Sequence, residues 1–342
     1  MSPLLRRILV SGLQVVATVA LIAWILMRND GGTVLATLGG IHMGWLAAAV
    51  ATMALSLVLG AWQWERLLAV QKVDAPFGRL FHAYGLGMFL NFVLPSGVGG
   101  DFVRALALQR DTKSGARGVA ATLLDRFAGL FTLALLAFAA SLLLVAGEHD
   151  PLFEKMALLT GLAALGFCVV AALLFSRRIL GWFAPLAGLV GEWRLITMAR
   201  GLREAFLEYR MAPGPVGAVV LLSLVVQFLR IVVHALCARA LGLHIEFAWF
   251  LLFVPIVSLV SILPISVGGW GLREGTQKTF FSLPGVMLGV APSQAPALAL
   301  AHALLASLVG MLVPAIVSMS AGIFITGRSG GTRPAVGQGG AP

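Results

Sequence analysis

The stretch NFVLPSGVGGDFVRAL, residues 91–106, decides how this chain folds, because it interrupts an apolar run with a proline, three glycines and two charged residues. A second stretch, SILPISVGGWGLREG, residues 261–275, repeats the pattern about half a chain later. At an offset of 169 residues, six positions are identical: Leu94, Pro95, Val98, Gly99, Gly100 and Arg104 match Leu263, Pro264, Val267, Gly268, Gly269 and Arg273. Proline and glycine are poor helix formers, so each stretch predicts a broken helix.

The composition around these breaks is that of a membrane protein. Hydrophobic residues make up 59% of the 342 residues and charged residues only 11%, with a mean hydropathy of +0.97. A soluble domain carries about 25% charged residues. Six apolar runs are long enough to span a bilayer, and two shorter runs, 80–95 and 249–265, lead into the two motifs. The six long runs are 8–27, 44–64, 118–147, 155–175, 215–241 and 296–325.

The charges of the loops predict that the two shorter runs enter the membrane and return. Cytoplasmic loops are enriched in lysine and arginine. If the run at 80–95 crossed, the basic cluster from Arg104 to Arg117 would lie outside, and re-entry keeps it inside. Re-entry of the run at 80–95 also keeps the basic stretch 177–210 on the cytoplasmic side. We therefore predict an all-α polytopic membrane protein with about six full transmembrane helices and two re-entrant segments broken by glycine and proline.

The resulting order of segments predicts an inverted repeat. The first half covers 8–147 and the second covers 155–325, and each reads span, span, re-entrant segment, span. The termini, 1–7 and the Gly/Pro-rich tail 326–342, are expected to be cytoplasmic, and the tail is expected to be disordered. Within the second half, 176–210 contains apolar residues at helical spacing opposite charged ones. It predicts either an amphipathic helix on the cytoplasmic surface or a linker helix that packs on the protein.

Matching Gly/Pro-broken segments in two inverted halves are typical of the substrate site of a transporter. Irregular backbone is tolerated at membrane depth only where protein or a water-filled cavity covers it, so the two motifs are expected to meet around a polar cavity. The alternative is that LPxxVGG only forms a tight turn between helices. The candidate substrate-binding residues are Asn91, Pro95, Gly99, Gly100, Asp101, Arg104, Asp125, Arg126, Arg230, His234, Pro264, Gly268, Gly269, Arg273 and Glu274.

Arginine suits a phosphate ligand because its planar guanidinium makes paired charge-assisted hydrogen bonds. Glycine lets backbone N–H groups approach an anion, and a helix beginning after Gly100 offers a positive end. The two motifs therefore predict a clamp for a phosphate headgroup around Arg104 and Arg273. The alternative is that Asp101, Asp125 and Glu274 neutralise arginines that are structural. Arg230 and His234 lie four residues apart, so both can line the cavity.

The sequence offers little support for other classes of function. The net charge of +10 is explained by topology, so no nucleic acid is expected as a partner. Six histidines are scattered without metal-ligand spacing, and no phosphate-binding GxxxxGK[ST] loop is present, so neither metal nor cofactor is expected and no catalytic residue is assigned. Cys168 and Cys237 lie in apolar runs and are expected to be small core residues.

Three motifs in order, NFVLPSGVGGDFVRAL, LLDRFAGLF at 123–131 and LPISVGGWGLREG, resemble signatures of the flippase-like transmembrane region of lysylphosphatidylglycerol synthases. The resemblance covers roughly 8–325. It implies movement or handling of an anionic phospholipid or a polyprenyl or hopanoid-type lipid at the bacterial inner membrane, with membrane lipids and envelope-lipid pathway proteins as partners. The two-part synthases add a soluble aminoacyl-transferase domain after this region, so that activity is not expected here.

Three hypotheses remain open at this point. The first is a lipid transporter whose cavity carries the headgroup while the tails stay in the bilayer. The second is an integral membrane enzyme acting on a phospholipid or polyprenyl lipid, with Asp101 or Asp125 as the base. The third is an accessory subunit of an envelope-lipid pathway. The oligomeric state is not indicated by the sequence.

Overall fold

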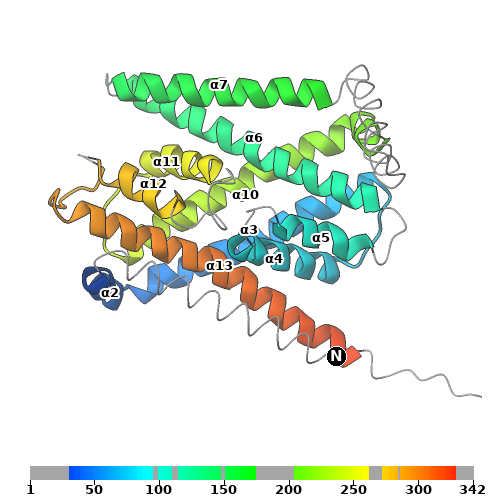
Figure 1. The fold of residues 1–342 in the computed structure, drawn as a ribbon, viewed down its shortest axis with the longest axis horizontal. Helices are drawn as coiled ribbons and strands as arrows, with labels where there is room; N and C mark the ends of the chain where they lie inside the picture. Colours follow the sequence, from blue (N-terminus) through cyan, green and yellow to red (C-terminus); the bar gives the residue numbers. More distant parts are fainter. Residues whose placement is uncertain are drawn as a thin grey trace, which may run out of the picture.

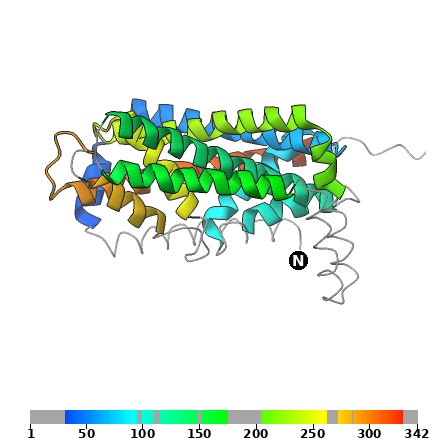
Figure 2. The ribbon, with the colours of Figure 1, turned by 90° about the horizontal axis from the view of Figure 1, so that it is seen from above.

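The computed structural model describes residues 31–94, 99–109, 115–147, 151–174, 204–261, 272–283 and 286–328. Within these ranges every regular element is an α-helix, and the protein is an all-α polytopic membrane protein (Figure 1). Figure 2 shows the long helices lying side by side along one axis. The helices are α2 (Gly31–Gly39), α3 (Met43–Val70), α4 (Phe77–Val93), α5 (Gly99–Gln109), α6 (Gly115–Gly147), α7 (Pro151–Leu174), α10 (Pro213–Ala240), α11 (Phe247–Val260), α12 (Leu272–Phe281) and α13 (Ala295–Arg328).

Five of the six predicted spans are confirmed as long apolar helices. They are α3, α6, α7, α10 and α13, each of which is long and apolar enough to cross a membrane. The observed bounds differ from the predicted ones by a few residues, except that α3 continues six residues further, to Val70. The first predicted span, 8–27, the termini 1–7 and 329–342, and most of the basic segment 176–210 lie outside the described residues.

The two helices that open the broken segments are short. α4 has 17 residues and α11 has 14, both fewer than the about 20 needed to span a bilayer. Each is followed by a second short helix that runs back along it. Tyr84 of α4 lies against Arg104 of α5, while the later Gly87 lies against the earlier Gly100, so the two helices are antiparallel. Phe250 and Phe253 of α11 likewise lie against Phe281 and Phe280 of α12, so both pairs are hairpins.

The α11–α12 hairpin is held by aromatic rings. Phe253 stacks on Phe280 with ring centroids 4.7 Å apart, and Phe250 lies 5.3 Å from Phe281. Figure 1 shows this hairpin in one half of the molecule and the α4–α5 hairpin in the other, so their broken ends point toward the middle from opposite ends.

The helices α3 and α10 precede the two hairpins and are built alike. Each has 28 residues, and their bounds differ by 170 at both ends. Both end in a Schellman turn, in which the residue after the C-cap adopts a left-handed conformation. Gly242 (φ 72°) fills this position after α10 and Lys72 (φ 54°) fills it after α3. In both turns the next residue donates its backbone N–H to a carbonyl five positions earlier.

Packing between the halves is reciprocal. α3 packs along α10, α4 packs on α13, and α11 packs on α6. Exchanging each helix for its counterpart in the other half, α4 for α11 and α6 for α13, leaves this set of pairs unchanged. The arrangement packs α3 and α10 against each other and brings the broken end of each hairpin close to the long helix of the opposite half.

Close backbone contact joins α4 to α5. A methyl group placed on Gly100 would lie 1.9 Å from the carbonyl oxygen of Gly87, so only glycine fits at this crossing. The repeated glycine of the first motif is thus explained by packing. Gly60 of α3 is also closely packed, because a methyl group there would lie 2.4 Å from the hydroxyl oxygen of Tyr84. Gly60 and Gly100 therefore allow α4 to pack closely between α3 and α5.

The described end of the basic segment, residues 204–210, is helical and packs on the protein. Tyr209 is 1% exposed and donates its hydroxyl hydrogen to the carbonyl of Leu67, at 3.0 Å. The Gln71 side-chain amide donates to the carbonyl of Ala205 at 3.0 Å. These contacts bury the apolar face of this segment against the end of α3.

Candidate functional site

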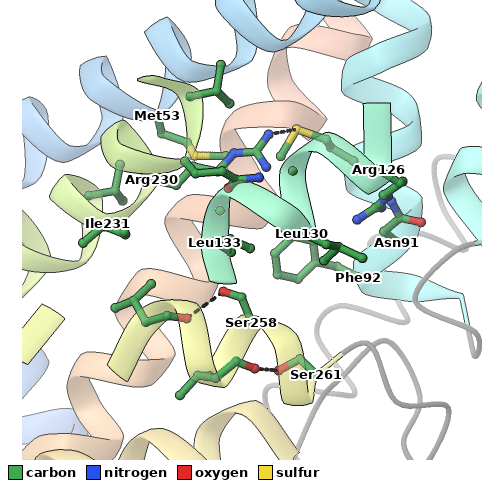
Figure 3. Close-up of a pocket in the computed structure, with 18 of the residues that line it drawn as sticks. Met53, Asn91, Phe92, Arg126, Leu130, Leu133, Arg230, Ile231, Ser258 and Ser261 are labelled. Atoms are coloured by element: carbon green, nitrogen blue, oxygen red, sulfur yellow. Dashed lines mark hydrogen bonds between the residues drawn. The ribbon is translucent and has the colours of Figure 1, made fainter. Parts of the chain in front are cut away.

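A cavity of about 260 Å³ lies between the two halves of the protein (Figure 3). Its walls come from α3, α4, α5 and α6 of the first half and from α10, α11, α12 and α13 of the second. The broken ends of both hairpins contribute, through Asn91 and Phe92 of α4 and Ser261 after α11. The polar cavity expected between the two motifs is therefore present among the described residues.

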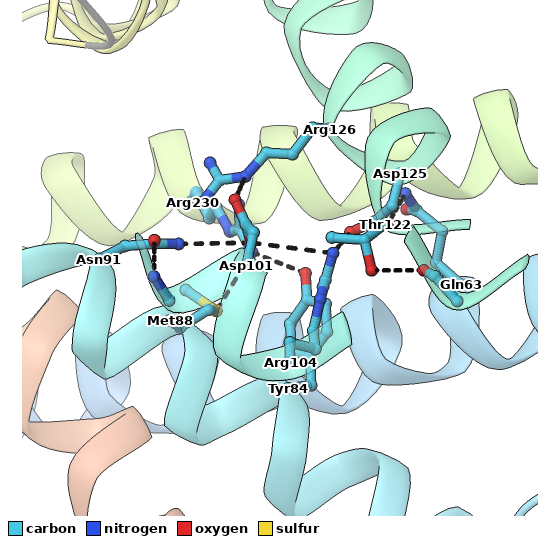
Figure 4. A network of polar contacts seen from close by, with 12 residues as sticks. Gln63, Tyr84, Met88, Asn91, Asp101, Arg104, Thr122, Asp125, Arg126 and Arg230 are labelled. Carbon is cyan, nitrogen blue, oxygen red and sulfur yellow. Dashed lines mark hydrogen bonds and ion pairs between the residues drawn. The ribbon is translucent and has the colours of Figure 1, made fainter. Parts of the chain in front are cut away.

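A chain of buried ion pairs forms one wall of the cavity (Figure 4). Arg104 of α5 donates to Asp125 of α6 at 2.8 Å and lies 3.8 Å from Asp101 one turn earlier. Gln63 of α3 donates to the other oxygen of Asp125 at 2.8 Å. The guanidinium of Arg104 also lies over the rings of Trp64 and Tyr84, at 4.6 and 4.9 Å from their centroids. Arg104 is 3% exposed, so its charge is neutralised and enclosed by the protein.

Asp101 connects this wall of the cavity to Arg126 and Asn91. Arg126 of α6 donates its Nε–H to Asp101, and the amide of Asn91 donates to the other carboxylate oxygen at 3.4 Å. The amide oxygen of Asn91 accepts the backbone N–H of Gly100 at 2.9 Å and so caps the start of α5. Arg126 keeps 36% of its side chain exposed, in contrast to Arg104.

Arg230 of α10 lines the cavity from the other half. It donates to the hydroxyl of Tyr84 at 3.3 Å and to the sulfur of Met88 at 3.5 Å, as Figure 3 shows in part. No carboxylate pairs with it among the described residues, and its Nε–H is buried without an acceptor. A guanidinium held only by neutral groups keeps its full charge available for an anionic ligand.

The second motif supplies Arg273 and Glu274, at the start of α12. Arg273 lines the cavity with its guanidinium 4.5 Å from the centre of the Phe92 ring, so it connects α12 to the end of α4. Glu274 is 3% exposed and accepts a hydrogen bond from the hydroxyl of Ser307 at 3.0 Å. Glu274 points to α13 and does not line the cavity.

A pair of histidines borders the cavity on the side of α10 and α13. His234 lines it, and its ring lies 5.6 Å from that of His302. His302 is completely buried, and its Nε2 is 2.9 Å from the carbonyl oxygen of His234. Phe250 and Phe281 pack on the other sides of this ring. His302 is therefore packed mainly against aromatic rings, as a core residue is.

Among the described residues, the charges around the cavity do not cancel. Four arginines and two aspartates line it, and Glu274 adds a third acid beside Arg273 in the chain. The segments 95–98 and 262–271, which join the hairpin helices, contain no ionisable residue and therefore add no charge. Assigning one carboxylate to each of Arg104, Arg126 and Arg273 leaves Arg230 as one positive charge in excess.

Most of the predicted site residues within the described ranges come together around this cavity. Asn91, Asp101, Arg104, Asp125, Arg126, Arg230, His234 and Arg273 line it. Gly99 and Gly100 start α5, and Glu274 lies next to the site. The remaining four, Pro95, Pro264, Gly268 and Gly269, lie outside the described residues.

Sequence reasoning missed several polar residues of the site. Gln63, Tyr84 and Gln227 all line the cavity, and both glutamines are buried. Each lies in a helix that is mostly apolar, and a polar side chain among apolar neighbours was the available signal. A buried amide in a membrane span needs a hydrogen-bond partner, so its position predicts an inward face.

Known proteins resemble this chain over most of its length. The model of the lysylphosphatidylglycerol synthase TM region matches residues 8–314. The chain is also similar to a protein of Methanothermobacter thermautotrophicus named "UPF0104 membrane protein". The two are 25% identical over 307 residues, which cover 82% of this chain and 85% of the relative. Both matches extend across the two hairpins and the cavity between them.

Proposed function

This chain belongs to the lysylphosphatidylglycerol synthase TM region family, and we propose that it binds the anionic headgroup of a membrane lipid in the polar cavity and carries it across the bilayer. The lipid class is a phospholipid or a polyprenyl or hopanoid-type lipid with an acidic headgroup. The hydrocarbon chains remain in an apolar environment during the movement. The site of action is the inner membrane of a bacterial cell.

The observation that carries this proposal is the unneutralised charge of Arg230. A cation inside a membrane protein is costly unless a partner compensates it, and the described residues offer Arg230 only a phenol and a thioether. A phosphodiester supplies one negative charge and acceptor oxygens in the geometry that a guanidinium binds in pairs. Arg126, which is partly exposed in the same cavity, provides a second donor.

Transport is supported by the position of the cavity as well as by its charge. The cavity lies between two hairpins that enter from opposite ends of the molecule, each broken near the middle (Figure 1). In transporters with inverted repeats, such discontinuous segments border the substrate, and access alternates between the two sides. The hairpin helix of each half packs on the long helix of the other half, α4 on α13 and α11 on α6. The two hairpins therefore have equivalent helix neighbours.

An enzymatic role for the acidic residues has less support. Asp125 accepts bonds from Arg104 and Gln63, while Asp101 accepts from Arg126 and Asn91. All four carboxylate oxygens thus already have donors. A general base needs an oxygen free to reach the proton of its substrate. We therefore assign these two carboxylates to holding the arginines in place.

The test compares Arg230→Gln with Arg239→Gln in purified protein reconstituted into vesicles. Arg239 is an exposed arginine on the same helix, so it controls for the general loss of charge. Movement and binding are measured with fluorescent phosphatidylglycerol and with phosphatidylcholine. We expect Arg230→Gln to weaken binding of phosphatidylglycerol about 10- to 150-fold, the value of one hydrogen bond to a charged group. Arg239→Gln should bind and transport like the unmodified protein.

Three other outcomes would contradict the role of Arg230 or the transport function. Normal, selective phosphatidylglycerol transport by Arg230→Gln would exclude the role assigned to this charge. A new lipid product, detected by mass spectrometry after incubation with the protein alone, would indicate an enzyme. Activity that requires an added envelope-lipid pathway protein would indicate an accessory subunit.

A further inference from the structure

A second space, apolar and separate from the polar cavity, lies between α6, α7 and α10. Its volume is also about 260 Å³. Side chains on all three helices line it, including Phe127 and Phe131 of α6, Cys168 and Ala171 of α7, and Val216 and Val220 of α10. None of its lining residues is charged or carries an amide or hydroxyl group. All three helices around this groove are long and apolar enough to span a membrane.

The groove lies on the same face of α10 as the polar cavity. Val216 and Val220 line the groove, while Ser223, Gln227 and Arg230 line the cavity. These five positions follow one another at steps of three or four residues and therefore form a single stripe along the helix. From Val220 to Arg230 the axis rises about 15 Å, at about 1.5 Å per residue.

Two contacts between α6 and α10 lie beside the residues that line the two spaces. Thr132 and Ser223 form a hydrogen bond at 3.2 Å, and Gln227 lies over Gly129. A methyl group on Gly129 would lie 2.8 Å from the Gln227 amide nitrogen, so glycine lets the glutamine pack against the helix backbone. The cavity-facing side of α6 includes Gly129, and the adjacent Ala128 faces the groove.

We propose that this groove holds a hydrocarbon chain of the same lipid whose headgroup binds at Arg230. The inference rests on the proposed function and adds a second part to that site. A groove whose only side-chain polar group is the thiol of Cys168 suits a ligand without hydrogen-bonding groups, since a polar ligand buried there would lose its hydrogen bonds to water. The spacing of about 15 Å along α10 places chain and headgroup on one continuous stripe. Gln227 then lies where the polar and apolar parts of the lipid join.

The test uses a phosphatidylglycerol with a photoreactive diazirine near the end of one acyl chain, and a phosphatidylcholine with the same chain. The protein is placed in nanodiscs containing either probe, and crosslinks are mapped by mass spectrometry to residues 124–131 of α6. We expect phosphatidylglycerol to label this stretch at least about tenfold more than phosphatidylcholine, since one charge-assisted bond selects its headgroup. In Arg230→Gln the two probes should label it equally.

Two neighbouring residues of α7 provide a matched pair of variants. Cys168 lines the groove, whereas Val169 does not and is 49% exposed. Cys168→Trp should abolish the selective crosslink to α6, and Val169→Trp should leave it unchanged. If Cys168→Trp does not yield folded protein, Ala171→Phe fills the same groove from the next turn.

The outcomes separate this inference from the proposed function. Equal labelling by both probes in the unmodified protein, together with selective transport of phosphatidylglycerol, would overturn the groove and leave the transport function standing. Selective labelling that survives Arg230→Gln would overturn the connection between chain and headgroup. Selective labelling that survives both Cys168→Trp and Ala171→Phe would show that the chain lies elsewhere.

Discussion

Replacing Asp125 with asparagine removes the charge that neutralises Arg104 while keeping the shape of the side chain nearly unchanged. The guanidinium of Arg104 is 3% exposed and the carboxylate of Asp125 is 7% exposed, so water cannot compensate for the loss. Leaving one partner of a buried ion pair uncompensated costs about 3–5 kcal/mol. Asp101 remains 3.8 Å from Arg104 and still neutralises part of its charge, so we expect a loss of stability toward the lower end of that range.

The free energy of unfolding would be measured in detergent micelles or nanodiscs, with the Arg117–Glu208 pair as the reference. Its side chains are 40% and 39% exposed and lie 3.2 Å apart. An exposed pair of this kind is worth about 0–1 kcal/mol, so Glu208→Gln should have a small effect. The double variant Arg104→Gln/Asp125→Asn removes both buried charges and should be more stable than Asp125→Asn alone.

A loss for Asp125→Asn as small as that for Glu208→Gln would refute the reasoning. It would mean that the Arg104–Asp125 pair is solvated in the membrane-embedded protein. A double variant less stable than Asp125→Asn would also contradict it, because the buried guanidinium would then not be the source of the cost.

Three further predictions concern packing and local structure. Gly100→Ala places a methyl group 1.9 Å from the Gly87 carbonyl oxygen and should cost about 3 kcal/mol of stability, the upper end of the usual range for overpacking, whereas Gly217→Ala, with open space around it, should be neutral or slightly stabilising in a thermal melt. Lys72→Gly relieves the left-handed conformation after α3 and should raise the free energy of unfolding by about 1 kcal/mol, while Gly242→Ala at the matching turn should lower it. Tyr209→Phe loses the bond to Leu67 and should cost about 1 kcal/mol at neutral pH. Burial also raises the pKa of Tyr209, so the folded state disfavours its ionised form, and stability should be complete below the unfolded pKa near 10 and decline above it. That decline should be weaker in Tyr209→Phe, as alkaline unfolding curves of the two proteins would reveal.

The helices were largely predictable because membrane spans are long and apolar throughout. Runs such as 118–147 and 215–241 correspond closely to α6 and α10, since few other structures bury so many apolar residues without a polar break. The two hairpins were predictable from their prolines and glycines together with the positions of the basic loops.

The partners of individual charges were harder to predict. The sequence places Asp125 and Arg126 side by side, and the structure turns them to different neighbours, Arg104 and Asp101. Which acid neutralises which arginine depends on the rotation of α6 about its axis and on the crossing of α4 over α5. Sequence spacing does not contain this information. For the same reason Arg230 could not be distinguished in advance from the arginines that have acidic partners.

The contact between Gly87 and Gly100 also restricts how the protein can move. Two backbones this close cannot slide past each other, the Arg104–Asp125 bond ties the same hairpin to α6, and the Gln63–Asp125 bond ties α6 to α3. We therefore expect α3, α4, α5 and α6 to move together as one block. In the second half, α11 and α13 each contain an internal proline, Pro255 and Pro314, which removes a backbone hydrogen bond and creates a bending point. In the proposed transport function, we expect alternating access to arise from bending at these prolines against a static first half, and faster amide hydrogen exchange around Pro255 and Pro314 than in α4 and α6 would reveal this asymmetry.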